Sequence, residues 1–551
     1  MYLAETDLHT LQRRYPLTTA HFLPMPNGRD ALAHVQSLDR RWASLIRGER
    51  PPAQVHHGDL PPTDADFDVV VAGGSLGLLA ALALARRGWR VMVFDQRVAG
   101  SAHREWNISQ EEAQALIPSG LFTEADLNEV AMRHYRTGLV RFAAGQAPTH
   151  ELWLDDVLDV AVDAGALLRL ARARLAACGV TVLDHREFRG VWLAASGPAR
   201  SVVEVAMADG RCERYGASLL VNAMGATSPL SLALAATPFS GVCPTVGTVA
   251  RGYAADGPRG VDLDLGEILV TTAHADDQGR QLMWEGFPGR HDELTVYLFY
   301  YDVVDPARPQ SLLDLFEVYF TRLAEYKAPG PDFAHLRPVY GFIPSRHGVC
   351  PSVNTRGVLA VGDASAHQSP LTFCGFGSFV RNLDRVASLA DYALRHERLE
   401  ASDLAHISAR QANVGLMWVF ARFMSPWRGG SEVNDIMNRF LAVLATLGED
   451  TVRRFFQDRT TWRDYTVMLL RFAVVFPTVL VWALDVLGWA GIGRWAGDYA
   501  RFTGAAWRGW LLGRLGHQGR GALLAFASRV NSGWGLRLRA WMGEWEVSKP
   551  G

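Results

Sequence analysis

The stretch Phe67–Asp95 constrains the fold of this chain most strongly, because it joins two apolar strands through a glycine-rich turn and a helix. Phe67–Ala72 is rich in valine, as expected for a parallel strand that is covered on both faces. After the turn and an Ala/Leu-rich helix, a second apolar strand, Arg90–Phe94, carries Asp95 at its carboxyl end. Strand, turn, helix, strand and acid in this order are typical of a dinucleotide-binding unit.

The turn has the sequence Gly73-Gly74-Ser75-Leu76-Gly77 and departs from the common glycine pattern. If Gly77 is the last glycine of the pattern and Gly74 the second, Ala72 stands at the first position. A turn without side chains lets the backbone approach a pyrophosphate, the helix presents its positive N-terminus, and Asp95 is suited to ribose hydroxyls. The alternative is a glycine-rich turn in an ordinary α/β sheet.

A second glycine motif lies far along the chain, where the apolar strand Gly357–Val361 runs into Gly362-Asp363-Ala364. In flavoproteins an Asp at this point contacts the ribityl chain, and the turn reaches the pyrophosphate. Gly375-Phe376-Gly377 then begins the helix Ser378–Leu394, whose N-terminus can face the flavin. The two motifs together favour FAD over NAD as the bound dinucleotide.

The middle of the chain also matches a flavoprotein pattern, because the buried strand Ala217–Ala223 ends in Met224-Gly225. Aromatic hydroxylases among the flavoproteins often have Asp-Gly at the end of this strand. The missing acid argues against hydroxylase-type handling of NADPH.

Composition limits the remaining classes. With 551 residues, 49% of them hydrophobic, the chain can build several domains around a large core. The net charge of −2 gives no support for a nucleic-acid partner. The five cysteines are scattered without a C-x-x-C or a metal-like Cys/His cluster, so we expect no metal, reduced thiols and a cytoplasmic location. The N-terminus shows no basic-then-apolar segment of a signal peptide.

These patterns predict an α/β fold: a Rossmann-like FAD-binding domain with an inserted antiparallel-sheet substrate domain and a helical C-terminal region. Residues 1–65 are expected to form a helical extension and a Pro-containing linker, to which we assign no chemistry. The FAD-binding domain is expected to be discontinuous, from 66–228 and 347–400. Alternating strands predict the substrate domain at 229–346, and 401–551 is expected to be helical.

The C-terminal region has an unusual composition. Eight of the 17 tryptophans lie between Trp482 and Trp545, and residues 491–551 hold eight Arg and one Lys against one Asp and two Glu. The uncharged run Phe472–Leu484 would reach only ~20 Å as a helix, short of the roughly 30 Å hydrocarbon core of a bilayer. Apolar helices with Trp and Arg favour contact with a membrane surface over spanning. The alternative is a soluble helical cap on the flavin domain.

One polar and aromatic segment, Arg104-Glu105-Trp106-Asn107-Ile108-Ser109, follows the cofactor acid where a flavin fold approaches the isoalloxazine. It could equally be a loop and helix cap, with Ser109 before the helix Gln110–Ile117. The stretch Val69–Ser109 resembles the CruA/CruP-type lycopene cyclases, which are FAD-dependent carotenoid enzymes with the same replaced glycine and an E-W-N-I-S pattern.

Two further segments carry this resemblance: Met283–Pro288, similar to a W-E-x-F-P segment, and Ser369–Ser378, similar to S-P-L-x-F-x-G-F-G. Cys374 replaces an expected glycine, and the resemblance spans most of residues 30–490. It implies cyclisation of lycopene to β-ionone ends on reduced FAD, without net redox change and with electrons from NADPH, at the cytoplasmic membrane surface. The residues expected to contact the cofactor are Gly73, Gly74, Ser75, Leu76, Gly77, Asp95, Gln96, Arg104, Trp106, Asn107, Gly225, Gly362, Asp363, Gly375, Phe376 and Gly377.

Such a cyclisation needs an acid in a dry apolar site. In the strand Gln281–Phe287, Glu285 shares one face with Met283 and Phe287, so desolvation should raise its pKa and let it donate a proton. Glu105 is the second candidate acid, although it could instead cap the following helix. Glu285 could also be partly solvated or form a structural hydrogen bond. Aromatic side chains that could stabilise a cation, or simply belong to the core, are Trp106, Trp284, Tyr297 and Phe299.

Two other functions stay open. A flavin-dependent reductase of polyprenyl chains, like the geranylgeranyl reductases, shares the fold. A non-catalytic, CruP-like flavin-binding paralogue would carry similar motifs.

Overall fold

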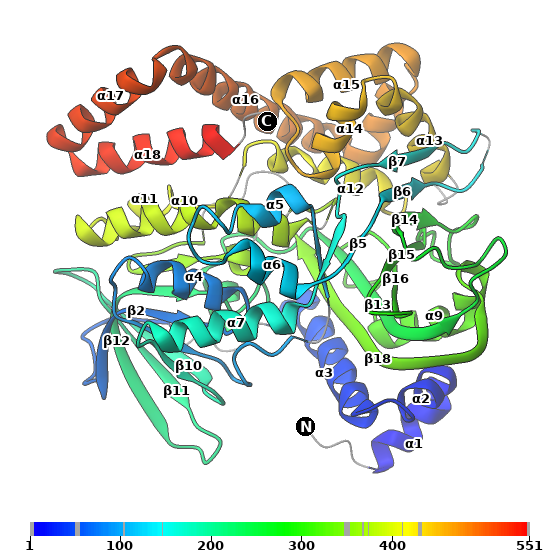
Figure 1. The fold of residues 1–551 in the computed structure, drawn as a ribbon, viewed down its shortest axis with the longest axis horizontal. Coiled ribbons are helices and arrows are strands. Elements are labelled where there is room, and N and C mark those ends of the chain that lie inside the picture. Colours follow the sequence, from blue (N-terminus) through cyan, green and yellow to red (C-terminus); the bar gives the residue numbers. More distant parts are fainter. Residues whose placement is uncertain are drawn as a thin grey trace.

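The computed structural model describes residues 5–49, 55–102, 105–145, 147–346, 353–365, 369–372, 374–409, 411–427 and 432–547. Two bodies built on sheets lie side by side in Figure 1, and the helices of the C-terminal third extend along one side of both. The predicted class, α/β with an antiparallel sheet and a helical C-terminal region, is confirmed.

The first body is an eight-stranded mixed sheet. Its strands, in spatial order, are β1 (Val55–Gly58), β10 (Glu187–Ala194), β11 (Ser201–Ala206), β12 (Cys212–Asn222), β2 (Ala65–Ala72), β3 (Val91–Phe94) and β9 (Thr181–Leu183), with β19 (Val358–Ala360) beside β12. Three helices cover one face: α4 (Leu76–Ala85), α7 (Ala164–Ala177) and α10 (Gly375–Arg395). Residues of β10 and β11 pack under the opposite face of β2 and β3.

The predicted dinucleotide unit is present as β2, α4 and β3, with β2 parallel to both β3 and β12. Its turn requires glycine at two positions. Gly73 has a φ of 111°, and a Cβ there would lie 2.5 Å from the carbonyl oxygen of Ala223. A Cβ on Gly74 would lie 2.5 Å from the Cβ of Ala99. The turn is therefore compressed between two neighbouring segments.

The second body is another eight-stranded sheet. Its order is β17 (Asp302–Val303), β13 (Gly241–Tyr253), β16 (Leu294–Phe299), β15 (Met283–Pro288), β14 (Leu265–Thr271), β6 (Thr137–Arg141) and β7 (Glu151–Leu154), with β18 (Pro329–Ser345) also beside β13. The strands β14, β15 and β16 form an antiparallel meander within the region where alternating strands were predicted. Glu285 of β15 lies opposite Tyr297 of β16, so both side chains are on one face.

Strand pairing departs from the predicted domain division at two places. β6 and β7 lie within 66–228 but join the second sheet, because β6 pairs in parallel with β14. β1 lies in the expected linker but pairs with β10 of the first sheet. Both pairings join segments far apart in the sequence, which local periodicity does not reveal. The exact domain boundaries stay a prediction.

A small third sheet holds the segment that follows Asp95. It consists of β4 (Trp106–Ile108), β8 (Val160–Val162) and β5 (Ala131–His134). The short helices α5 (Gln110–Gln114) and α6 (Glu124–Val130) flank it.

The N-terminal extension packs on the second body. Its helices are α1 (Glu5–Arg14), α2 (Pro16–Phe22) and α3 (Gly28–Ile46), and they share a core with α9 (Leu312–Tyr326). Asp39 of α3 accepts hydrogen bonds from the backbone N–H groups of Leu312 (2.7 Å) and Leu313 (3.1 Å), so it caps α9 from another helix.

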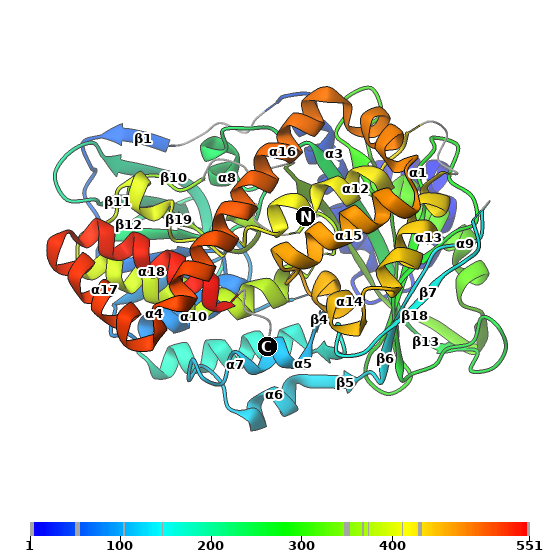
Figure 2. The same cartoon turned by 90° about the horizontal axis from the view of Figure 1, so that it is seen from above.

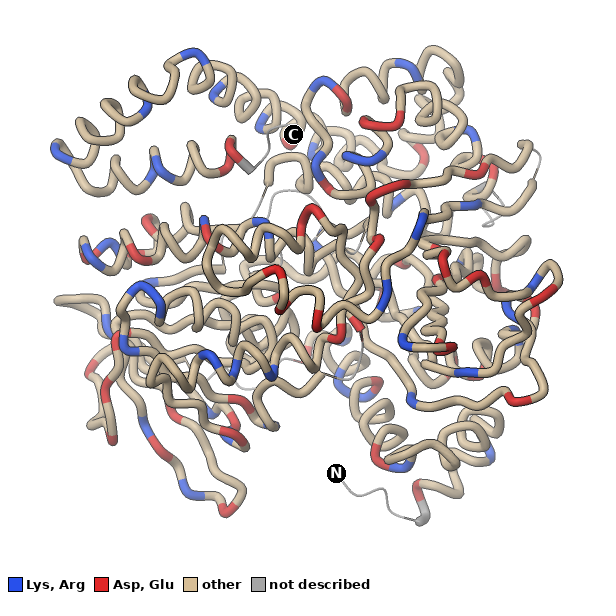
Figure 3. The backbone as a smooth tube through the Cα atoms, viewed as in Figure 1, with Lys and Arg blue, Asp and Glu red and all other residues tan. Residues whose placement is uncertain are grey.

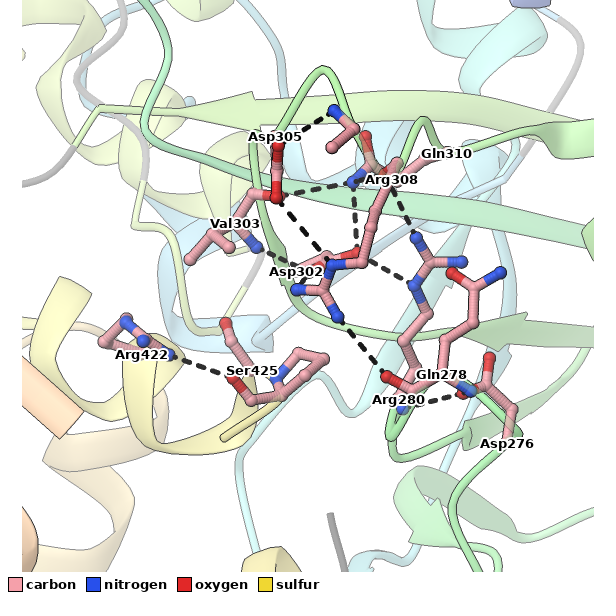
Figure 4. A network of polar contacts seen from close by, with 12 residues as sticks. Asp276, Gln278, Arg280, Asp302, Val303, Asp305, Arg308, Gln310, Arg422 and Ser425 are labelled. Atoms are coloured by element: carbon pink, nitrogen blue, oxygen red, sulfur yellow. Dashed lines mark hydrogen bonds and ion pairs between the residues drawn. The ribbon is translucent and has the colours of Figure 1, made fainter. Parts of the chain in front are cut away.

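A buried polar network fixes the chain between β16 and α9 (Figure 4). Arg280 and Asp302 form an ion pair of 2.8 Å with side chains only 7% and 1% exposed. Gln310 donates to the same Asp302 carboxylate at 3.0 Å, and its own Oε1 accepts from Trp42 of α3 at 3.1 Å. The network therefore ties α3 to the end of the second sheet.

The C-terminal third is helical, as predicted. Its elements are α11 (Ala401–Leu404), η2 (Val414–Leu416), α12 (Trp418–Met424), α13 (Glu432–Ala445), α14 (Glu449–Phe456), α15 (Trp462–Val475), α16 (Val479–Arg514), α17 (Gly516–Val530) and α18 (Ser532–Val547). Helices α12 to α16 share a core with residues of the second sheet. Figure 2 shows α16 running across the molecule toward α17 and α18, which lie near α10.

Candidate functional site

A cleft of about 1120 Å³ lies between the two bodies. One wall comes from the β2–α4 turn, the end of β3 and the N-terminus of α10, and the other from the second sheet and α3. Thirteen of the expected cofactor contacts line it: Gly73, Gly74, Ser75, Leu76, Asp95, Gln96, Trp106, Asn107, Gly225, Gly362, Asp363, Gly375 and Phe376. Residues separated by hundreds of positions in the sequence therefore meet in one cavity.

Asp95 is held at the glycine turn by the backbone. Its Oδ2 accepts a hydrogen bond from the N–H of Gly74 at 2.7 Å, and its Oδ1 accepts from the N–H of Arg97 at 2.7 Å. Each carboxylate oxygen can accept a further bond. Asp95 can thus bind hydroxyl groups in the cleft while it fixes the shape of the turn.

Two helices direct their N-termini at the cleft. The first turn of α4 begins at Leu76, and that of α10 begins at Gly375 and Phe376. Gly362 and Asp363 lie between them in the short 3-10 helix η1 (Gly362–Ser365), where Gly362 has a φ of 56°. Two positive helix ends facing one cavity favour an anionic ligand such as a phosphate.

Two expected contacts have packing roles instead. Gly77 and Gly377 are absent from the cleft lining. A Cβ on Gly77 would lie 3.1 Å from Ala223 and Val71, and one on Gly377 would lie 2.4 Å from Oε2 of Glu112. Both glycines let a helix approach its neighbour closely. Arg104, the remaining expected contact, lies outside the described residues.

In the E-W-N-I-S segment, some residues line the cleft and others have structural roles. Trp106 lines the cleft and lies near Phe376, with ring centroids 4.5 Å apart, and Asn107 lines it beside Trp106. Ile108 is fully buried. Ser109 and Glu112 form the capping box of α5, as the helix-cap interpretation predicts.

Glu105 lines the cleft but is already engaged. It forms an ion pair with Arg337 of β18 and accepts a hydrogen bond from the Thr295 hydroxyl at 3.1 Å. Pairing with an arginine stabilises the ionised form of a carboxyl group, so such a group is poorly suited to donate a proton. The structure therefore places Glu105 in an anchoring position on the cleft wall.

Glu285 has the opposite environment. Its side chain faces the cleft from the centre of β15, and burial raises its pKa from 4.5 to about 8. No hydrogen bond or ion pair joins its carboxyl to another group in the described part of the chain. Glu285 also lines a second, smaller cavity of about 50 Å³ toward α13 and α14, whose walls include Phe299, Met437 and Phe455. This acid therefore stands between the cleft and an apolar pocket.

The aromatic candidates divide between the two faces of the sheet. Tyr297 and Phe299 line the cleft with Trp106. Trp284 does not: it stacks on Tyr326 at 5.1 Å in the core under α9. The alternation of side chains along β15 explains this, since Trp284 and Glu285 are neighbours and point to opposite faces.

The sequence interpretation missed the contribution of the N-terminal extension. Arg40, Arg41 and Trp42 of α3 line the cleft, although the extension was expected to carry no chemistry. Trp42, within an otherwise polar part of the predicted helix, is the sequence feature that could have indicated this contribution. Among the residues that the structure describes, no group of three or more His, Cys, Asp or Glu side chains is placed to hold a metal ion.

The raised pKa of Glu285 predicts a pH-dependent effect on stability. Since its pKa is higher in the folded protein than in the unfolded chain, its contribution to stability is greatest at low pH and is lost as the pH rises through about 8. Glu285→Gln stays neutral and avoids this loss. We expect the thermal midpoint of this variant, relative to the unsubstituted protein, to increase between about pH 5 and about pH 9.

Glu325→Gln provides the control for this titration, because Glu325 is a surface residue of α9 with a side chain 58% exposed. The difference in thermal midpoint between Glu325→Gln and the unsubstituted protein should change little over the same pH range. A constant difference for Glu285→Gln would contradict the raised pKa.

Comparison with known proteins places the fold. No protein-family model and no curated protein sequence matches the chain. The flavoprotein/dehydrogenase from Cytophaga hutchinsonii is 14% identical, with a TM-score of 0.50 over 71% of this chain and 92% of that chain. A mutant of the halogenase PltM in complex with FAD is 13% identical, with a TM-score of 0.50 over 86% of this chain and 99% of that chain.

A third similar structure is p-nitrophenol 4-monooxygenase PnpA from Pseudomonas putida DLL-E4, which is 16% identical, with a TM-score of 0.50 over 68% of this chain and 94% of that chain. Identities this low establish similarity of fold alone. The chain thus has the Rossmann-like fold that a flavoprotein, a halogenase and a monooxygenase share.

Proposed function

We propose that the cleft binds FAD. The observation that carries this proposal is the convergence of the glycine turn, Asp95, Gly362-Asp363 and the N-terminus of α10 in one cavity. The turn and the N-termini of α4 and α10 would face the pyrophosphate and the flavin, while Asp95 and Asp363 would bind ribose and ribityl hydroxyls. Trp106, Asn107 and Phe376 would border the ring system.

Asp363→Ala tests this assignment. Loss of a hydrogen bond to a charged group costs about 1.5–3 kcal/mol, so the Kd for FAD should increase about 10- to 100-fold. Quenching of flavin fluorescence on titration into the apoprotein measures this. Asp277→Ala, at an exposed position outside the cleft lining, should bind FAD like the unsubstituted protein. Unchanged affinity of the Asp363 variant would contradict the assigned role.

We further propose that the protein is a lycopene cyclase that forms β-ionone ends. Support comes from Glu285, a half-buried acid without a partner in the described part of the chain, in an apolar wall of the same cleft. A carboxyl that stays protonated near neutral pH can protonate the terminal double bond of a polyene. The chain then closes to a ring carbocation, and loss of a neighbouring proton gives the product.

The surroundings of Glu285 suit such an intermediate. Phe299 and Tyr297 line the cavity, where their aromatic rings can stabilise positive charge, and buried apolar walls exclude water that would capture the cation. Bound FAD in its reduced state would supply an electron-rich surface at the cleft, with NADPH as the expected source of electrons. Cyclisation itself is redox-neutral.

Pigment analysis in a bacterium that accumulates lycopene tests this function. We expect γ- or β-carotene to appear with the unsubstituted protein. Glu285→Gln should retain FAD but lose cyclisation about 100-fold or more, because the proton donor is removed. Glu325→Gln serves as the control and should cyclise normally.

The other outcomes separate the competing functions. More saturated isoprenoids would favour a polyprenyl reductase. Unchanged lycopene with FAD-loaded protein would favour a non-catalytic flavin-binding paralogue. Cyclisation that survives Glu285→Gln would overturn the assignment of the acid.

We also propose that the C-terminal helices contact a membrane surface. Among the described residues, every exposed large apolar side chain except Leu17, Leu23, Val98 and Trp153 lies between Val467 and Trp541. Val474 is 80% exposed, Trp489 78% and Trp534 63%. In Figure 3 the α16–α18 arm is mostly uncharged, with Lys and Arg outnumbering Asp and Glu. Such a surface suits the interface of a bilayer with anionic lipids.

The shape of α16 favours lying on the membrane over spanning it. Val479–Arg514 is the one described helix whose length and composition would allow a span, and 6% of its apolar window is buried. Gly488 is non-helical, with a φ of 65° and a ψ of 173°, and divides this helix. The part before Gly488 is too short to cross a bilayer, and the part after it contains five charged residues, Arg494, Asp498, Arg501, Arg508 and Arg514.

Sedimentation with lipid vesicles tests the membrane proposal. The full-length protein should bind vesicles containing anionic lipid more tightly than neutral ones, and salt should weaken this preference. Replacing Trp489, Trp507 and Trp534 together by Ser should reduce binding about tenfold or more, since each loses buried apolar area. Trp153→Ser, at a tryptophan 57% exposed on β7, is the matched control. Equal binding by the triple variant would refute the proposal.

A further inference from the structure

A fully buried acid, Asp458, lies behind the cleft wall and contacts Thr372. Asp458 follows α14 and is completely buried, with a left-handed backbone φ of 55°. Its backbone carbonyl accepts a hydrogen bond from the side chain of Asn413 at 2.6 Å. This bond holds the backbone in the unusual conformation that turns the carboxyl inward.

The Thr372 hydroxyl joins the carboxyl of Asp458 to the cleft. Thr372 Oγ1 donates to Asp458 Oδ2 at 2.5 Å, and the Ser369 hydroxyl also stabilises the ionised carboxyl. Thr372 lines both the large cleft and the small apolar pocket. Glu285 lines the same two cavities. The Thr372 hydroxyl and the Glu285 carboxyl therefore border one space.

The charges of both acids also act on two other buried groups. Burial raises the pKa of the Cys374 thiol, and the charges of Asp458 and Glu285 raise it further. The same two charges act on the buried Tyr301 hydroxyl, which donates to the carbonyl of Leu371. Cys374 and Tyr301 thus lie within electrostatic range of both carboxyls.

The proposed cyclisation leaves one requirement unmet by Glu285, because the ring carbocation must release a proton to a base. We propose that Thr372 and Asp458 form this proton-accepting pair, an inference that rests on the proposed cyclase function. The Thr372 oxygen takes the proton from the carbon next to the cation while its own proton passes to Asp458. The C–H electron pair becomes the ring double bond, so charge and atoms balance, and the step needs no oxidant or reductant.

The charges around Asp458 permit this role. Burial raises its pKa to about 6, and the Thr372 hydrogen bond, the charge of Arg381 and a hydrogen bond from Ser369 counteract part of that increase. Arg381 is itself paired with Glu112, and Arg459 is paired with Glu111 at 2.8 Å. Since Arg381 and Arg459 already have carboxylate partners, Asp458 can be ionised at neutral pH and still take up a proton.

Kinetics with the full-length, FAD-loaded and reduced protein test the pair, using lycopene in phosphatidylcholine vesicles. The rate should fall below about pH 6, where Asp458 is protonated, and above about pH 8, where Glu285 is ionised. Asp458→Asn should slow cyclisation about 100-fold and remove the acidic limb of the profile. Thr372→Val should also lose about 100-fold, and Thr372→Ser should restore most of the rate.

The matched control is Thr460→Val. Thr460 is 3% exposed, two residues beyond Asp458, and its hydroxyl has no partner in the described part of the chain. This variant should cyclise like the unsubstituted protein. FAD content and the thermal midpoint establish that each variant is folded.

Infrared titration without lycopene gives a readout that does not depend on turnover. A carboxyl ionising near pH 6 should disappear in Asp458→Asn and shift to higher pH in Thr372→Val, because that hydrogen bond favours the ionised form. Normal cyclisation by folded Asp458→Asn or Thr372→Val overturns the pair alone. Failure of the unsubstituted protein to cyclise lycopene overturns the proposed function, and with it the role of the pair.

Discussion

The buried ion pair between Arg381 and Glu112 is the interaction on which the geometry of the site depends. Their side chains are 7% and 1% exposed, and they join α10 to α5 directly beneath the N-terminus of α10. Arg381 also donates to the carbonyl of Gln457 at 3.1 Å, so the same guanidinium holds the segment after α14. Breaking such a pair leaves a charge buried without a partner and costs about 3–5 kcal/mol. Gly377 permits this close approach, since any Cβ there would collide with Glu112.

Desolvation separates the two acids of the cleft into different chemical roles. Glu105 and Glu285 line the same cavity, but Glu105 meets a guanidinium and a hydroxyl, whereas Glu285 meets apolar walls. Coulombic attraction stabilises the first as an anion, and burial alone raises the pKa of the second. The difference arises from β18, which delivers Arg337 to one end of the sheet face and not to its centre.

Local patterns predicted the parts of the site that a short segment completes by itself. The glycine turn with Asp95 and the Gly362-Asp363 turn could be recognised because strand, glycine and helix follow one another directly. Alternation along β15 also placed Glu285 on the same face as Phe287, and both line the cleft. Partners supplied from far away could not be recognised: Arg337 for Glu105, Asp458 for Thr372, and α3 as a cleft wall. Each depends on how distant elements pack, which no local periodicity encodes.

The C-terminal helices complete the site as well as carrying the apolar surface. Met437 and Phe440 of α13 and Phe455 of α14 form the far wall of the small pocket beside Glu285, and the segment after α14 contributes Asp458. Helix α15, which carries some of the exposed apolar side chains, packs on the same helical core through its buried face, where Phe440 contacts Phe472 with ring centroids 5.7 Å apart. In the proposed cyclase, the C-terminal helices would therefore contact both the lipophilic polyene and the membrane in which it dissolves. If contact with a bilayer displaced these helices, water would enter the pocket beside Glu285. The pKa of the Glu285 carboxyl, on which the proposed proton transfer depends, would then change.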